Sequence, residues 1–461
     1  MAKFTAHRSM PELVMPARPT PRETKILSDV DDCYDLRIYS FGIEFFRCRP
    51  CGCPTLSPAK AVKVALAEAL VYYYPIAGRL REILHTNKLV VDCTGEGVVF
   101  VEASADVGLK EFGNPSPRPL YPCIEELLCD AGDIKVVVDK PLFFVQVTEF
   151  IGGGFALGFQ ACHNIVDGFG VNQFLRSIAD LARGTRPTVL PVWERSILMA
   201  RTPPCIIDID PAYMPVMTGS EYNTDVDAED VMLSTPIEIM VHKYFLFCPK
   251  DITYLRRHLI SWLLNKPTTA FELITAVMWR CRTIALGYAV DTKVRLSFTL
   301  NARGRWKTEL PIPQGYYGNA LVHTIVEATV GDLCGSPLGH TVELIHKAKA
   351  EMSLERMRSM VDMMALLRGR PTLPTRHLYR VSDVSHIGDD ILDFGWAEWI
   401  SGGMPLPKLT SFHTTYKDEY DGESIMVSVL LPISAIDKFA KEISSWLNRD
   451  YGGNYLRRSS L

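Results

Sequence analysis

The residues with the clearest chemical potential are a histidine and an aspartate four positions apart, His163 and Asp167. They lie in the run ACHNIVDGFG, residues 161–170, in which two glycines follow the aspartate. An imidazole takes up a proton near neutral pH, and a carboxylate in the next turn can fix how the ring points. The run therefore predicts general-base chemistry on an already activated substrate. The alternative is a histidine with a structural role alone.

Two strand-like segments precede this histidine. Residues 143–150 and 155–162 are joined by a glycine-rich turn, which predicts a hairpin. The glycine run lacks the Lys and Ser/Thr of a phosphate-binding loop. Residues 171–183 carry apolar side chains at helical spacing, and Gly184 ends that helix. We thus expect His163 at a strand end and Asp167 in the turn before a helix, where scaffolds display reactive groups.

Other chemistries lack their signatures in the sequence. The chain has no Gly-x-Ser-x-Gly elbow and no His-Glu-x-x-His zinc helix. Cys162 precedes His163, but adjacent strand residues point to opposite faces, so we interpret this cysteine as a packing residue. Cys48, Cys51 and Cys53 form a cluster without a nearby fourth ligand. We therefore predict free thiols and no metal.

Length and composition indicate a globular protein of two domains. The chain has 461 residues, of which 47% are hydrophobic and 22% charged. We predict an N-terminal domain at 1–195, a crossover linker at 196–232 and a C-terminal domain at 233–461. Proline alternates with acidic residues in the linker. The net charge of -4 predicts no nucleic-acid partner. The sequence contains no stretch of about 18 apolar residues, so we expect no membrane span.

The chain ends and the cysteines bear on the cellular compartment. The N-terminus lacks the apolar core of a signal peptide, and 12 scattered cysteines are typical of a reducing compartment. We expect a cytoplasmic protein. The alternative is the peroxisome, because the final Ser459-Ser460-Leu461 differs from a Ser-Lys-Leu address at one position.

Further local signals predict a mixed α/β chain. Ser57 and Pro58 are typical of a helix start, and Pro75 and Gly78 of its end. Thr269 and Glu272 form a capping-box pattern that opens a helix through residue 281. Strands are predicted at 89–91, 98–101, 294–300 and 424–431, and helical segments at 339–367 and 435–447.

Several motifs in a fixed order resemble those of the plant BAHD acyl-CoA-dependent acyltransferases. The family's His-x-x-x-Asp-Gly motif is present at 163–168, and Asp-Phe-Gly-Trp-Gly is present as DFGWA at 393–397. Asn-Ala-Arg at 301–303 and Tyr-Tyr-Gly-Asn at 316–319 lie between them. Segments 19–25 and 27–32 are similar to the branch of benzyl alcohol O-benzoyltransferases and, more distantly, to taxane acyltransferases. The resemblance spans nearly the whole chain.

This resemblance implies a fold and a set of reactants. The fold would be two similar-sized α/β domains like those of chloramphenicol acetyltransferase, with a solvent channel between them. Acyl-CoA would enter the channel from one face and the acceptor from the other. Acyl-CoA would be a co-substrate, with no permanently bound cofactor, and we expect a monomer.

The resemblance also assigns roles to residues of the first motif. His163 would deprotonate the acceptor in the middle of the channel. The carboxylate of Asp167 would turn away from substrate and orient the motif by pairing with an arginine. Arg303 is the candidate partner, because a buried carboxylate needs a cation or hydrogen-bond donors.

Three residues outside the first motif complete the predicted site. Asp393 would hold the second motif in place, and Trp396 is a binding candidate. Asn319 is a candidate donor to the oxyanion, with a packing or turn role as its alternative. Ala397 departs from the family's glycine, which is tolerable where the backbone φ is negative and costly where it is positive.

The branch resemblance predicts an O-acyltransferase that forms an ester of a small alcohol, such as benzyl alcohol, from benzoyl-CoA or a related donor. Alternative acceptors are alkaloids, terpenoids and amines. Ala397 motivates a second class, a non-catalytic paralogue that binds acyl-CoA or another ligand. A condensation-type domain is a third, but such domains usually carry a second histidine where Cys162 stands.

Overall fold

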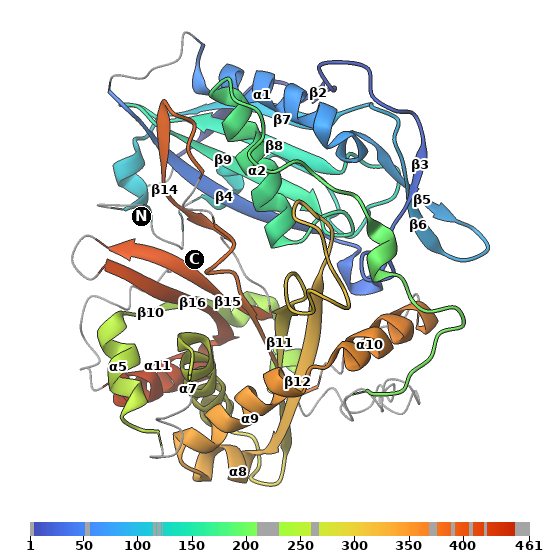
Figure 1. Ribbon diagram of the computed structural model, residues 1–461. Helices are drawn as coiled ribbons and strands as arrows, with labels where there is room; N and C mark the ends of the chain where they lie inside the picture. The colour runs from blue at the N-terminus through green and yellow to red at the C-terminus, as the bar shows by residue number, and fades with distance from the viewer. Residues whose placement is uncertain are drawn as a thin grey trace.

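The computed structural model describes residues 4–447 apart from 51–55, 114–116, 118–120, 122, 210–229, 260–266, 368–375, 389–391, 405–408 and 419–421. The chain forms two sheet-rich domains, one above the other in Figure 1, each with its own hydrophobic core. The predicted α/β architecture is confirmed.

A mixed sheet forms the centre of the first domain, and two helices, α1 and α2, pack on it. Its strands run in the order β1 (Ala6–Arg8), β7 (Val98–Ala105), β8 (Phe143–Glu149), β9 (Phe155–Cys162), β4 (Tyr39–Cys48) and β14 (Ala397–Gly403), with β2 (Glu12–Val14) also paired to β7. A small second sheet has the order β3 (Thr24–Ile26), β6 (Lys88–Asp92), β5 (Arg79–Ile83). The helices are α1 (Pro58–Tyr72) and α2 (Gly168–Ala182).

The predicted hairpin is the pair β8 and β9, which are antiparallel with Phe143 opposite Ala161. Every residue of β9 is buried, because core residues cover the sheet on both faces. This explains why the strand is apolar at both alternating sets of positions, apart from the buried Gln160. Since β9 ends at Cys162, the next residue leaves the sheet at a fixed point.

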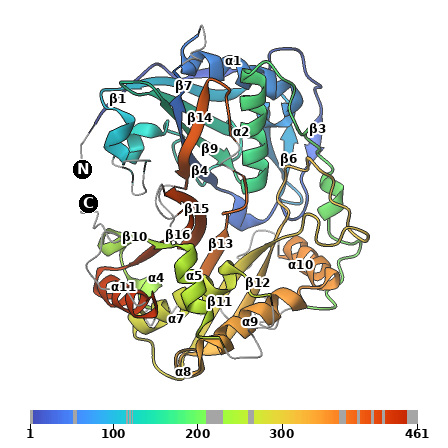
Figure 2. The same cartoon turned by 60° about the vertical axis from the view of Figure 1, so that its left-hand side comes forward.

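A six-stranded sheet forms the second domain. Its order is β10 (Met240–Phe247), β16 (Gly422–Pro432), β15 (Thr410–Asp418), β13 (Leu378–Asp383), β11 (Lys293–Asn301) and β12 (Leu321–Thr329). The described helices of this half are α4 (Val231–Ser234), α5 (Pro249–Arg256), α7 (Ala270–Leu286), α8 (Val330–Gly335), α9 (Leu338–Glu351), α10 (Leu354–Leu366) and α11 (Ile433–Leu447). Figures 1 and 2 show the sheet between the first domain and helices α7, α9 and α11.

The capping box predicted for α7 is present. The Thr269 hydroxyl accepts from the Glu272 N–H at 3.3 Å, and the Glu272 carboxylate accepts from the Thr269 N–H at 2.8 Å. The helix runs past residue 281 to Leu286, where Gly287 at a φ of +71° ends it. Burial of nearly the whole helix extends it beyond the stretch that local signals predicted.

Strand β14 is exchanged between the domains. It follows most of the second domain in sequence, yet it pairs antiparallel with β4 of the first sheet. Just before it, Phe394 and Trp396 pack against Phe155, and Phe394 also contacts Phe46. Our division of the sequence at 195 and 233 did not anticipate this exchange, which anchors the second motif in the first domain's core.

The glycine requirement of the second motif falls on Gly395. This residue has a φ of +79°, and its N–H donates to the Asp393 carboxylate at 2.7 Å. Asp393 also pairs with Arg49 at 3.0 Å, and together they lower the pKa of Asp393 against the opposing effect of burial. Ala397 lies fully buried at the start of β14 without a positive φ. Its methyl group therefore causes no backbone strain.

We expect Gly395→Ala to lower the free energy of unfolding by about 1–2 kcal/mol, because an L-residue pays this cost in the left-handed region. The added Cβ would also lie 3.1 Å from the Arg183 side chain. Urea denaturation measures the change. Gly335→Ala is the control, since that glycine has no positive φ and open space around it. Equal losses in the two variants would contradict the strain argument.

Candidate active site

The backbone of His163 is held by both domains while its side chain keeps partial exposure. Its N–H donates to the Ile38 carbonyl at 2.9 Å, and its carbonyl accepts from the Asn319 side-chain amide at 2.7 Å. The ring nitrogen Nδ1 is buried and makes no hydrogen bond. Other atoms of the residue reach solvent. The main chain at His163 is thus fixed, and the imidazole is partly open.

Asp167 is buried, and both of its carboxylate oxygens accept hydrogen bonds from the protein. It is the N-cap of α2 and accepts from the Gly170 N–H at 2.9 Å. Two guanidinium nitrogens of Arg303 donate to its two oxygens at 2.8 and 3.1 Å, and the Ala320 N–H adds a bond at 3.1 Å. A two-pronged arginine contact is among the strongest a carboxylate makes. The carboxylate therefore orients the turn from within the protein.

Arg303 is itself oriented by the second domain. It follows β11, and its backbone N–H donates to the Asn301 side-chain oxygen at 3.0 Å. The guanidinium also donates to the carbonyls of Tyr316 at 3.2 Å and Gly318 at 2.6 Å. Its carbon lies 5.3 Å from the centre of the Phe169 ring. Arg303 thus joins the second domain to the first turn of α2.

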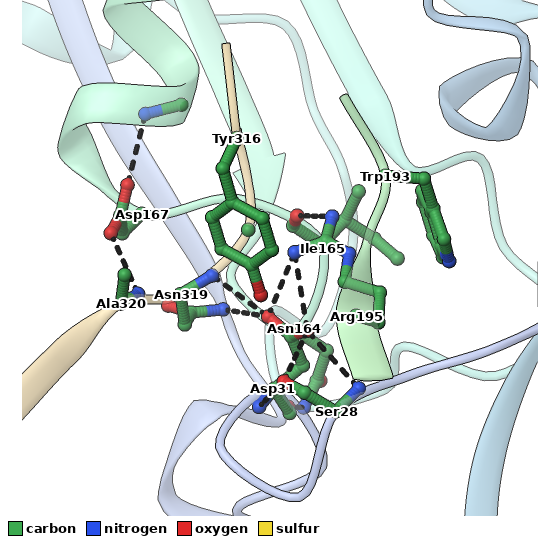
Figure 3. A network of polar contacts seen from close by, with 12 residues as sticks. Ser28, Asp31, Asn164, Ile165, Asp167, Trp193, Arg195, Tyr316, Asn319 and Ala320 are labelled. Atoms are coloured by element: carbon green, nitrogen blue, oxygen red, sulfur yellow. Dashed lines mark hydrogen bonds and ion pairs between the residues drawn. The ribbon is translucent and has the colours of Figure 1, made fainter. Parts of the chain in front are cut away.

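A second buried carboxylate, Asp31, lies beneath the same turn (Figure 3). It accepts from the Ser28 hydroxyl at 2.6 Å, from Arg195 at 3.2 Å, and from the backbone and side-chain N–H groups of Asn319, both at 2.8 Å. The side-chain amide of Asn164 donates to the Asp31 carbonyl at 2.6 Å. Asp31 therefore joins Arg195 and Asn319 to Asn164, the residue next to His163.

Arg195 is 2% exposed and is surrounded by aromatic rings. It donates to the Ile165 carbonyl at 2.9 Å, and its guanidinium carbon lies 4.3 Å from the Trp193 ring centre and 4.9 Å from that of Tyr317. Burial alone would lower the pKa of Arg195, but the charge of Asp31 together with Tyr316 and Tyr317 outweighs burial and raises it. The guanidinium therefore stays charged in the core.

Two glycines allow this close packing between the domains. A Cβ on Gly170 would lie 2.0 Å from the Tyr317 carbonyl oxygen, and one on Gly318 would lie 1.1 Å from an Arg195 nitrogen. A side chain at 170 would require the Tyr317 backbone to move, and one at 318 would require the buried Arg195 guanidinium to move. Space at the interface thus explains the glycines at 170 and 318.

Sequence reasoning missed the roles of Asp31 and Arg195. Asp31 belongs to the segment 27–32 that carried the branch resemblance, which was the available signal. Arg195 stands at a predicted domain boundary and in no motif. Its partner is 164 residues away, so no local pattern marks the pair.

The remaining predicted binding residues serve the structure. Both hydrogens of the Asn319 side-chain amide are engaged, one by Asp31 and one by the His163 carbonyl. Trp396 is 7% exposed within the aromatic cluster around Phe155. In this arrangement Asn319 positions the turn that carries His163, and Trp396 fills the first domain's core.

The cysteines do not build a reactive centre in the described part of the chain. Cys162 is fully buried, and burial raises the pKa of its thiol to about 12. Cys51 and Cys53 lie outside the described residues, so the free thiols expected for the cluster with Cys48 stay a prediction. Among the described residues, no group of three or more His, Cys, Asp or Glu could hold a metal ion.

A cavity of about 480 Å³ lies between the domains beside Arg303. One face of α2 forms one wall, including Phe169 and Arg176, and residues 303–304 and 312–316 form the other. The imidazole of His163 does not line it. The cavity therefore borders the ion pair that orients the turn.

Comparison with known proteins places this site in a family. The model of the Transferase family matches residues 5–446. "Acyl transferase 1" of Oryza sativa subsp. japonica is 51% identical, over 99% of each chain. "Spermidine hydroxycinnamoyltransferase 1" of the same organism is 49% identical, over 92% of this chain and 95% of that protein. "Benzyl alcohol O-benzoyltransferase" of Petunia hybrida is 41% identical, over 97% and 95%.

Solved structures share the fold. Vinorine synthase superposes with a TM-score of 0.71 at 20% identity, covering 96% of this chain and 98% of its own. F. sporotrichioides TRI101 complexed with coenzyme A and T-2 gives 0.65 at 16% identity, covering 92% and 98%. Fold, motifs and relatives define an acyltransferase. The chain belongs to the Transferase family, the plant BAHD acyltransferases whose motifs it carries.

None of its described helices is long and apolar enough to cross a membrane.

We expect Arg195→Leu to destabilise the protein by about 3–5 kcal/mol, because it leaves the Asp31 carboxylate buried without its cation. The midpoint of thermal unfolding measures the loss. Arg18→Leu is the control: it removes an arginine from the exposed Arg18–Glu68 pair, and such pairs contribute little. If both variants melt alike, Asp31 does not depend on Arg195.

Proposed function

We propose that this acyltransferase forms an ester by moving an acyl group, benzoyl or a related one, from acyl-CoA to the hydroxyl of a small alcohol. The observation that carries the proposal is the state of His163, whose main chain is clamped from both domains while its side chain is partly exposed. The relative named benzyl alcohol O-benzoyltransferase supports the substrate class, and the coenzyme A complex of a structure with this fold supports the donor.

His163 acts as general base in this mechanism. The imidazole takes the proton of the acceptor hydroxyl while its oxygen attacks the thioester carbonyl, and a C–O bond forms. The tetrahedral oxyanion then collapses, the C–S bond breaks, and the imidazolium returns the proton to the coenzyme sulfur. No protein nucleophile takes part. Acid–base help is typically worth about 10²–10⁴-fold, and positioning of the reactants adds to it.

Asp167 and Arg303 are positioning residues in this proposal. Their two-pronged contact, with the Ala320 bond, fixes the turn between His163 and α2. Neither carboxylate oxygen of Asp167 is left for a substrate, because each accepts two hydrogen bonds from the protein. Asp393 acts further away, by holding Gly395 and Arg49 at the exchanged strand.

A second candidate acceptor is an amine. The specific observation is the relative named spermidine hydroxycinnamoyltransferase, which is 49% identical over 92% of this chain. The same base would take a proton from the attacking nitrogen, and the product would be an amide. Benzoyl-CoA offered with benzyl alcohol and, separately, with spermidine separates the two candidates by the rate of thiol release.

Three broader features stay predictions. These are the domain boundaries at 195 and 233, a monomeric state, and a cytoplasmic location with the peroxisome as alternative. The final Ser459-Ser460-Leu461 lies outside the described residues. Light scattering of the purified protein tests the monomer.

Replacing His163 with Ala is expected to lower kcat by at least about 10²-fold, because the base is lost. Thiol release from benzoyl-CoA with benzyl alcohol measures it. The buried Nδ1 makes no hydrogen bond, so the thermal midpoint should stay close to that of the parent. His85→Ala, at an exposed position, is the control. Near-normal turnover in His163→Ala would reject the base assignment. Binding of acyl-CoA by the parent without thiol release would favour the non-catalytic paralogue.

Arg303→Lys keeps the charge but cannot span both oxygens of Asp167, so the catalytic turn should lose its alignment. We expect kcat to fall by up to about 10²-fold, with little change in the KM for acyl-CoA. Asp167→Asn should act through the same pair. The double variant should therefore lose less than the product of the single losses. Fully independent effects in this cycle would show that the pair does not work as a unit.

A further inference from the structure

The face of the second sheet that is turned towards the first domain carries polar side chains. Leu296 and Phe298 of β11 point into the core with the helices, so the alternate residue Thr299 points the other way. The hydroxyls of Thr299 and Ser382, on neighbouring strands, are 3.2 Å apart, and His323 of β12 is paired with Thr299. All three polar residues are partly exposed. Solvent therefore reaches this face between the domains.

This polar row lies close to His163. Asn319 and Ala320, which bind the His163 carbonyl and Asp167, directly precede β12. His323 follows Ala320 by three residues, about 10 Å along an extended strand. Burial lowers the pKa of His323 to about 4, with smaller contributions from the charges of Arg380 and His163. At neutral pH His323 is thus uncharged, with one donor and one acceptor nitrogen.

Arg380 brings a permanent charge to the same face. It stands opposite Ser297 in the pairing of β13 with β11, two residues before Ser382, and is partly exposed. In the part of the chain that the structure describes, no carboxylate or carbonyl accepts from it. The other arginines at the site, Arg195 and Arg303, each hold a buried aspartate. A guanidinium between the domains without such a partner is suited to a ligand's anion.

We propose that Arg380 binds a carboxylate carried by one of the two reactants, with His323, Thr299 and Ser382 as neutral hydrogen-bonding neighbours across from His163. This inference rests on the proposed function and names its substrate class: the alcohol or the acyl group bears a carboxylate. A polyamine acceptor would instead bring a like charge towards Arg380, which is unfavourable at short range.

Two pairs of matched substrates locate the carboxylate. In the first arm, benzoyl-CoA is given with 4-(hydroxymethyl)benzoate or with benzyl alcohol. In the second, benzyl alcohol is given with succinyl-CoA or with butyryl-CoA. We expect kcat/KM to favour the carboxylate by at least about tenfold in one arm, as charge-assisted bonds do. Arg380→Gln should remove that preference and leave the neutral pair nearly unchanged, while Arg380→Lys keeps part of it.

Arg186→Gln is the control, because it removes one exposed arginine charge elsewhere and should keep the preference. Wild-type ratios near one in both arms would overturn the inference, as would a preference that survives in Arg380→Gln. If wild type releases thiol with none of the four combinations, the proposed function fails. The inference is then decided by calorimetric binding of the same four compounds to His163→Ala with and without Arg380→Gln. Equal affinity for carboxylate and neutral partners there would overturn it.

Discussion

A buried carboxylate must be paired, and this constraint shapes the whole active-site region. Asp31 and Asp167 lie on either side of the turn at His163, and each binds one arginine together with an N–H of the segment 319–320. The cations and the segment come from outside the first domain's sheet. Moving the domains apart would take Arg303 from Asp167 and the two Asn319 N–H donors from Asp31, which leaves buried carboxylates short of partners. The position of His163 is therefore coupled to the docking of the domains.

The exchange of β14 ties the domains together by a different kind of interaction. Its pairing with β4 adds backbone hydrogen bonds, and the rings of Phe394 and Trp396 add apolar contacts to the first domain's core. The positive φ at Gly395 makes the turn into this strand possible. The second motif thus attaches β14 to the first domain, which explains why the alanine at 397 is compatible with an intact site. Polar pairs align the segments near His163, and apolar contacts hold the segment that leads into β14.

Much of the local structure was predictable, because its causes lie within a few residues. The hairpin of β8 and β9, the turn at Asp167 before α2 and the capping box of Thr269 and Glu272 each follow from neighbours in the chain, although α2 begins at Gly168 and not at residue 171. The end of α7 was predicted five residues early, since burial beyond Cys281 carries the helix to Leu286. The order of the motifs indicated the family, but not which of their residues serve the scaffold.

By itself, then, the amino-acid sequence indicated the elements that local signals mark, the histidine at a strand end and the chemistry that such a histidine supports. Tertiary structure decided which polar groups are paired. Asp31 meets Asn319 across 288 residues, and Arg49 meets Asp393 across 344. It also placed Arg380 on the inner face of the second sheet, and it used both amide hydrogens of Asn319 inside the protein. The physical reason is that hydrogen bonds and ion pairs depend on distance in space, which separation along the chain does not encode.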